Sequence, residues 1–162
     1  MKIRGAPAIG IVTSYGMALG ALKIETGSRE EFVERFQGII STFAATRPTA
    51  RNLFWAIDRM QRVAETGKDI DWIKRALVAE AVKIHREELE ADQKLSQFGA
   101  ELIEDGFTIL THCNTGVLAT AGYGTALGVI KQAKEQGRNI KVFATETRPL
   151  LQGCLLYTSP SP

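Results

Sequence analysis

Apolar residues recur at helical spacing over the first two thirds of the chain and predict a series of helices. Pro7 suits the first turn of a helix that runs to about Glu25. Ser28 and Glu31 have the spacing of a capping box and predict the start of a second helix. That helix should end at Arg47-Pro48, because proline disfavours helical geometry in the residue before it.

Two more helices are expected before residue 105. Thr49 is expected to cap the third helix, whose apolar positions are Leu53, Phe54, Ile57, Met60 and Val63. Asp69 should cap a fourth, long helix that reaches about Glu104, with a break near Gly99. The first helix should pack closely against another backbone, because it carries glycines at roughly helical spacing at Gly10, Gly16 and Gly20.

At Gly106 the period of the pattern changes. Residues 107–111 predict a buried strand, residues 118–136 a helix that ends at Gly137, and residues 140–144 a second strand. Together they form one βαβ unit, for which a right-handed crossover is expected. The fold class is therefore α/β.

We expect a helical N-terminal domain over residues 1–105, with its start missing, followed by the first βαβ unit of a Rossmann-like doubly wound parallel sheet over residues 106–153. That sheet should be incomplete, because one βαβ unit cannot bury both of its faces. Residues 154–162 carry no charge, fit neither period, and match a translation of a transposase adapter used in shotgun library preparation. They predict a non-native tail, with a natural unstructured tail as the alternative. Met1 is expected to be an internal methionine.

Composition and charge exclude several classes of protein. The 162 residues are 44% hydrophobic and 23% charged, which is ordinary for a globular protein, and the net charge of +2 predicts neither a nucleic-acid nor a membrane surface. The glycine-interrupted apolar stretch at residues 8–22 suits neither a signal peptide nor a membrane span, so a cytoplasmic location is expected. Two cysteines without CxxC spacing predict no metal site and no disulfide framework.

Cys113 is the candidate for reactive chemistry. It should lie at the carboxyl end of the first strand, where ligands bind in α/β sheets, and beside a helix N-terminus, whose dipole favours a thiolate. A buried, inert cysteine is an equally good interpretation from position alone. His112 should point to the opposite face, so a Cys–His pair is not expected.

Three other segments are candidates for anion binding. Arg4, Gly5 and Ala6 open a helix, where backbone N–H groups and a guanidinium can hold a phosphate. Arg47 stands at another helix entry, and Gln152 follows the second strand at the same sheet edge as Cys113. A plain helix start, a solvated arginine and a structural loop remain the alternatives.

Four blocks taken together resemble one known family: MKIRGAPAIG at 1–10, RPTARNLFWA at 47–56, THCNTGVLATAGYGTALG at 111–128 and ETRPLLQG at 146–153. Over residues 1–153 the chain resembles the methylthioribose-1-phosphate isomerases of methionine salvage. The wider family also includes ribose-1,5-bisphosphate isomerase and the α, β and δ regulatory subunits of the translation-initiation guanine-nucleotide exchange factor. Both remain alternatives.

The resemblance implies an aldose–ketose isomerase that acts on 5-methylthioribose 1-phosphate without a cofactor and forms a homodimer at full length. It implies that Cys113 is catalytic and that the substrate-binding residues are Arg4, Gly5, Ala6, Arg47 and Gln152. The family's acid/base aspartate belongs to a later part of the sequence, beyond Gly153. The 162-residue chain is therefore expected to be inactive by itself.

Overall fold

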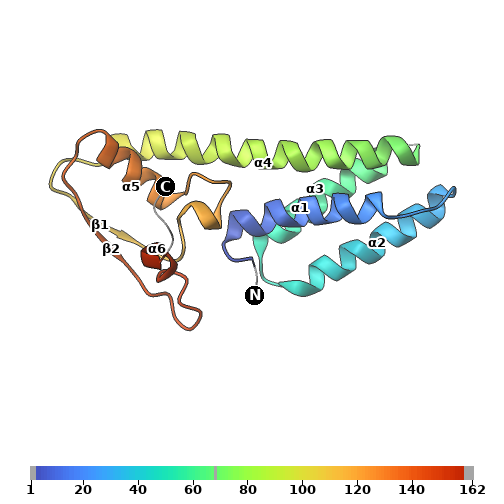
Figure 1. The fold of residues 1–162 in the computed structure, drawn as a ribbon, viewed down its shortest axis with the longest axis horizontal. Coiled ribbons are helices and arrows are strands. Elements are labelled where there is room, and N and C mark those ends of the chain that lie inside the picture. The colour runs from blue at the N-terminus through green and yellow to red at the C-terminus, as the bar shows by residue number, and fades with distance from the viewer. Residues whose placement is uncertain (1–2, 68, 159–162) are drawn as a thin grey trace. The chain divides into compact units, whose positions relative to one another are not determined.

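The computed structural model describes residues 3–67 and 69–158 as an α/β arrangement that is mostly helical (Figure 1). The elements in chain order are α1 (Ala6–Leu22), α2 (Arg29–Thr46), α3 (Arg51–Thr66), α4 (Ile70–Glu101), β1 (Thr108–Thr111), the 3-10 helix η1 (Val117–Ala119), α5 (Ala126–Glu135), β2 (Lys141–Ala144) and α6 (Leu155–Thr158). Among the described helices, none is both long and apolar enough to span a membrane.

The contacts divide the chain into two compact units, and each is described by itself. The helical unit consists of residues 9–86, and the mixed unit combines residues 3–8 with residues 87–158 among those described. These compact units are defined by contacts within this chain and need not coincide with the domains of a whole protein. The expected domain boundary at residue 105 therefore stays a prediction.

In the helical unit, α2 begins as the sequence predicts. The Ser28 hydroxyl accepts a hydrogen bond from the Glu31 backbone N–H at 3.3 Å. The other half of the capping box is indirect, because the Ser28 N–H donates to the Thr26 hydroxyl and that hydroxyl donates to the Glu31 carboxylate. The helix ends at Thr46, so the stop at Arg47-Pro48 is confirmed.

Ser28→Ala is expected to lower the free energy of unfolding by about 1 kcal/mol, because it leaves a helix N–H without its acceptor. Urea denaturation of the purified chain measures this change. Ser41→Ala is the matched control, since that exposed hydroxyl only donates to the Gln37 carbonyl within α2. Equal changes for the two variants would contradict the capping role.

The glycines of α1 make three close approaches, of which only one is to a backbone. A Cβ at Gly10 would lie 3.1 Å from the Asn52 carbonyl oxygen of α3. At Gly16 and Gly20 the space is taken by the side chains of Phe43 and Ile39 from α2. The prediction of backbone packing is therefore correct at Gly10 and wrong at the other two glycines.

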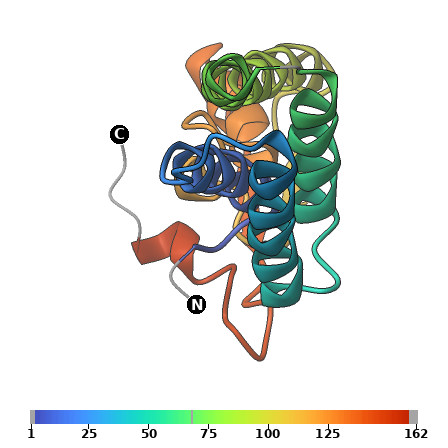
Figure 2. The same cartoon turned by 90° about the vertical axis from the view of Figure 1, so that its right-hand side faces the viewer.

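The starts of α3 and α4 differ in how they are capped. Thr49 does not cap α3, because the Ala50 N–H bonds to the Arg47 carbonyl at 3.0 Å and this turn puts Ala50 at the position before the helix. Asp69 caps α4 as predicted, accepting from the Trp72 N–H at 2.8 Å. Figure 2 shows α2 and α3 side by side. Residues of both helices line the pocket described below.

In the mixed unit, α4 continues through Gly99 to Glu101, so the predicted break is wrong. The glycine makes room for a neighbour instead: a Cβ there would lie 2.6 Å from a methyl group of Val129 on α5. Tertiary packing therefore explains a glycine that the sequence pattern attributes to a chain break.

Strands β1 and β2 are parallel neighbours, in a register that runs from Thr108 opposite Lys141 to Thr111 opposite Ala144. Because α5 connects them, the predicted βαβ unit is confirmed. One face of the sheet packs on a cluster of Ala100, Ile103, Val129, Ala133 and Ile140 through Ile109. On the other face, Leu110 and Phe143 are 69% and 61% exposed. The prediction of a fully buried strand is therefore wrong for this face.

Helix α5 begins at Ala126, eight residues later than expected from the start predicted at Leu118. Gly122 and Gly124 have positive φ angles of 117° and 100°, and their N–H groups donate to the Thr120 hydroxyl at 3.3 and 3.0 Å. A threonine hydroxyl that bonds nearby backbone in this way competes with the helix. Gly137, with φ 86°, follows the last turn of α5 as predicted.

Candidate functional site

Cys113 lies in a tight turn just beyond the end of β1. Its φ angle is 71°, in the left-handed region that non-glycine residues seldom adopt, and its side chain is partly buried. The Cys113 N–H donates to the hydroxyl of Thr147, at 3.0 Å, and Thr147 itself has φ 58°. Backbone outliers of this kind concentrate at functional sites.

This position corrects the expected setting of Cys113. The strand ends at Thr111, and the next helix is the single 3-10 turn η1. An α-helix begins only at Ala126, so the argument from a helix dipole beside the thiol does not apply in this structure. The strained turn is therefore the feature that distinguishes this cysteine.

Hydroxyl groups join the ends of the two strands around this turn. The Thr145 hydroxyl lies 2.7 Å from Nδ1 of His112 and 3.1 Å from the Thr147 hydroxyl. His112 therefore bonds to the end of β2. The expectation that it forms no pair with Cys113 stays a prediction. The network fixes Thr147, which in turn holds the backbone of Cys113.

The loop after β2 is closed onto the strand. The Gly153 N–H donates to the Glu146 carbonyl at 3.2 Å, and a Cβ at Gly153 would overlap the Thr145 carbonyl oxygen. Leu151, within the loop, has φ 52°. Gln152 is partly buried, and its amide oxygen is buried without a hydrogen-bond partner. We define the segment from Glu146 to Gly153 as the Gln152 loop.

The segment before α1 contacts two parts of this site. Gly5 has φ 110°, and a Cβ there would lie 2.5 Å from the Ala119 Cα atom of η1. The Arg4 guanidinium donates to the Leu150 carbonyl of the Gln152 loop at 3.2 Å, while its Nε is buried without a partner. Ala6 is the first residue of α1. Five of the six predicted residues therefore belong to the mixed unit.

Arg47 belongs to the helical unit, where it is the residue that follows the last turn of α2. Its side chain is partly buried and has an interaction partner. Arg47 is expected at the entry of α3, but it lies at the end of α2, and three residues separate it from the first residue of α3. Its role with the substrate stays a prediction.

Unpartnered buried atoms mark two of the predicted substrate-binding residues. Among the described residues, the buried side-chain atoms without a hydrogen bond are Nε of Arg4, Oε1 of Gln152 and Oδ2 of Asp92. Buried polar groups in folded proteins are almost always satisfied. The first is a donor suited to a phosphate oxygen, and the second is an acceptor suited to a hydroxyl. A sugar phosphate offers both groups.

Asp92 is the residue that the sequence analysis missed. It lies on α4 and is 3% exposed. Burial raises the pKa of its carboxyl group, although hydrogen bonds from the Thr120 hydroxyl and the Ala121 N–H lower it in part. Burial and the Asp92 charge also raise the pKa of Glu88, one turn earlier. The available signal was the four-residue spacing of Asp92 with Ser96 and Ala100, which are fully buried.

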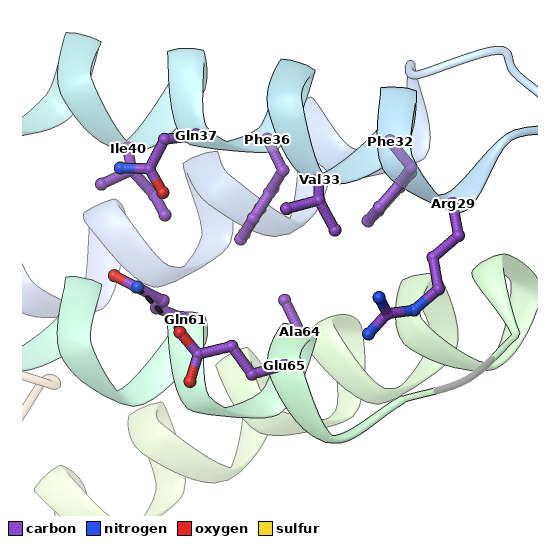
Figure 3. Close-up of a pocket in the computed structure, with 9 residues that line it drawn as sticks. All are labelled: Arg29, Phe32, Val33, Phe36, Gln37, Ile40, Gln61, Ala64 and Glu65. Carbon is purple, nitrogen blue, oxygen red and sulfur yellow. Dashed lines mark hydrogen bonds between the residues drawn. The ribbon is translucent and has the colours of Figure 1, made fainter.

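A separate apolar pocket lies in the helical unit between α2 and α3 (Figure 3). Its volume is about 180 Å³, and its lining residues are Arg29, Phe32, Val33, Phe36, Gln37, Ile40, Gln61, Ala64 and Glu65. None of the predicted site residues contributes to it. It is therefore distinct from the group around Cys113.

Comparison with known proteins gives a consistent family. Residues 2–159 match the Initiation factor 2 subunit family. The chain is 60% identical over 156 residues to the methylthioribose-1-phosphate isomerase of Dehalococcoides mccartyi, covering 96% of this chain and 47% of that relative. The chain thus spans about half the length of the curated relatives it matches.

Two solved structures are similar to this chain in fold and sequence. The 5-methylthioribose 1-phosphate isomerase of Pyrococcus horikoshii is 40% identical with a TM-score of 0.84, covering 99% of this chain and 47% of that one. The delta subunit of translation initiation factor eIF-2B from A. fulgidus is 43% identical with a TM-score of 0.78, covering 98% and 48%. With a family match over nearly all of its residues, this chain belongs to the Initiation factor 2 subunit family.

Proposed function

We propose that this chain is the first half of an aldose–ketose isomerase that converts 5-methylthioribose 1-phosphate to 5-methylthioribulose 1-phosphate in methionine salvage. The observation that carries the proposal is the pair of unpartnered buried atoms on Arg4 and Gln152, in the same unit as Cys113. Relatives at 52–60% identity that bear the isomerase name support it.

The phosphate is bound at the start of α1. The Arg4 guanidinium and the N–H groups at Gly5 and Ala6 contact it, because a helix N-terminus and a guanidinium both favour an anion. The Gln152 amide accepts a hydrogen bond from a sugar hydroxyl. Arg47 is proposed as a further substrate-binding residue. The close approach of Gly5 to Ala119 keeps this segment in place.

Cys113 acts on the sugar. The anomeric hydroxyl of the substrate is phosphorylated, so the ring has to open while the phosphate is held, and a hydrogen then moves from C2 to C1. In a proton route Cys113 or the aspartate is the base: a Cys113 thiolate takes the proton from C2, and the thiol so formed returns it to C1. In a hydride route the two groups move the hydroxyl protons. An aspartate from a later part of a full-length protein is the acid/base partner.

The βαβ unit begins a Rossmann-like, doubly wound sheet in the proposed full-length protein. The exposed Leu110 and Phe143 support this, because parallel sheets are normally covered on both faces. We further propose a cytoplasmic homodimer.

The test is a chimera that joins residues 1–153 to the second half of the Dehalococcoides mccartyi relative. We expect it to convert 5-methylthioribose 1-phosphate at a rate near that of the relative, and we expect no turnover by the 162-residue chain alone. The second half expressed alone is the control. A folded chimera without turnover would contradict the proposal.

One alternative has an observation in its favour, namely the similarity to the A. fulgidus delta subunit. A non-catalytic regulatory subunit would bind a sugar phosphate without converting it. Ribose 1,5-bisphosphate, assayed beside the methylthio substrate, tests the other isomerase of the family. Turnover of the methylthio substrate, turnover of ribose 1,5-bisphosphate, or binding without turnover by the chimera therefore separates the three functions.

A further inference from the structure

Asp92 is a buried acid that carries an unsatisfied oxygen. Its side chain is 3% exposed, and its Oδ2 has no hydrogen-bond partner. Burying such a group is unfavourable, and an apolar residue at the same place on α4 would avoid the desolvation. We therefore expect its hydrogen bonds to have a structural role that an apolar residue could not fill.

The hydrogen bonds of the Asp92 carboxylate lead into the segment between η1 and α5. The carboxylate accepts hydrogen bonds from the Thr120 hydroxyl and the Ala121 N–H. The oxygen of the same hydroxyl accepts from the N–H groups of Gly122 and Gly124. Since the hydroxyl has one proton, giving it to Asp92 leaves both lone pairs directed at the two glycines.

The segment ordered in this way touches the proposed phosphate-binding residues. Ala119 directly precedes Thr120 and lies against Gly5, which leaves no room for a Cβ. Arg4 directly precedes Gly5, and its guanidinium donates a hydrogen bond to the Leu150 carbonyl. A displaced Ala119 would therefore release Gly5 and let Arg4 move.

We propose that Asp92 is a positioning residue that holds Thr120 and Ala119 against Gly5 and so fixes Arg4 for the sugar phosphate. This inference rests on the proposed function for its ligand. Asp92 does not touch the substrate. It acts through the Thr120 hydroxyl and the backbone of the segment.

The experiment compares variants of the 162-residue chain by NMR. Asp92→Ala removes the acceptor, Asp92→Asn keeps one acceptor oxygen, and Thr120→Val removes the hydroxyl from the other side. Glu88→Gln is the matched control, since it neutralises an acid one turn earlier on α4. The readouts are amide exchange at Gly122 and Gly124, the Arg4 Nε–H signal assigned with Arg4→Lys, and titration with 5-methylthioribose 1-phosphate.

We expect Asp92→Ala and Thr120→Val to speed exchange at both glycines at least tenfold, to shift the Arg4 signal, and to weaken sugar phosphate binding at least tenfold. Asp92→Asn should keep amide exchange, the Arg4 signal and sugar phosphate binding close to those of the parent chain. Glu88→Gln should resemble the parent chain in all three. Unchanged exchange and an unchanged Arg4 signal in Asp92→Ala or Thr120→Val would overturn the positioning role. Changes in those two readouts, together with a folded chimera that neither binds nor converts the sugar phosphate, would support positioning and overturn the proposed function.

Discussion

Cys113→Ser is expected to lower kcat of the chimera by roughly 10²–10⁴-fold, the usual contribution of an acid/base group. A serine hydroxyl is a much weaker acid than a thiol, so it is a poor substitute in proton transfer. The substitution preserves the size of the side chain, so the turn with φ 71° and its hydrogen bond to Thr147 should persist. Steady-state kinetics on purified variants measures the effect.

KM should change less than threefold, because the phosphate contacts from Arg4 are untouched. Ser41→Ala is a suitable control, since its exposed hydroxyl on α2 lies outside the proposed site. A Cys113→Ser chimera that keeps more than a tenth of parental kcat would exclude a catalytic role for the thiol. The inert buried cysteine would then be the better interpretation.

Gly153→Ala is expected to lower the free energy of unfolding by about 2–3 kcal/mol and to weaken sugar phosphate binding. Its new methyl group would overlap the Thr145 carbonyl oxygen, which is backbone and cannot rotate away. The Gln152 loop would have to move, and the neighbouring Gln152 amide would move with it. Urea denaturation and a binding titration on the same samples measure both losses.

The matched control is Gly38→Ala on α2, where no atom outside the neighbouring residues and the helix's own backbone lies within 4 Å of the added carbon. Alanine in an exposed helix should stabilise the chain by about 0.5–1 kcal/mol. The two substitutions add the same atom, so opposite signs would show that local space decides the outcome. Equal changes would contradict the close contact at Gly153.

Helices with local signals were predictable from the sequence. The Ser28 and Asp69 caps act within three residues along the chain, and the stop at Arg47-Pro48 depends on one dipeptide. The errors arise where a distant residue intervenes. Gly99 suggested a break because its partner Val129 lies on another helix, and residues 118–125 suggested helix because the glycine conformations there depend on Thr120.

The composition of the site was largely predictable from the sequence, whereas its geometry was not. Arg4, Gly5, Cys113 and Gln152 came from recognisable blocks, and the structure brings them into one unit. The left-handed φ of Cys113 depends on Thr147, which is 34 residues away and adjacent only once the strands pair. Asp92 was missed because a single acid on a helix is usually solvated, and its burial depends on packing against a separate segment.

The exposed pair Leu110 and Phe143 bears on where a larger sheet would bind its ligand. Within the described residues each strand has one neighbour, and α5 connects the two strands across the opposite face. A further strand beside β1 that arrived through a helix over Leu110 would reverse the winding of the sheet at β1. The crevice that opens at such a reversal lies at the carboxyl end of the strand, where Cys113 follows β1. The thiol would then lie at the topological switch point of the sheet.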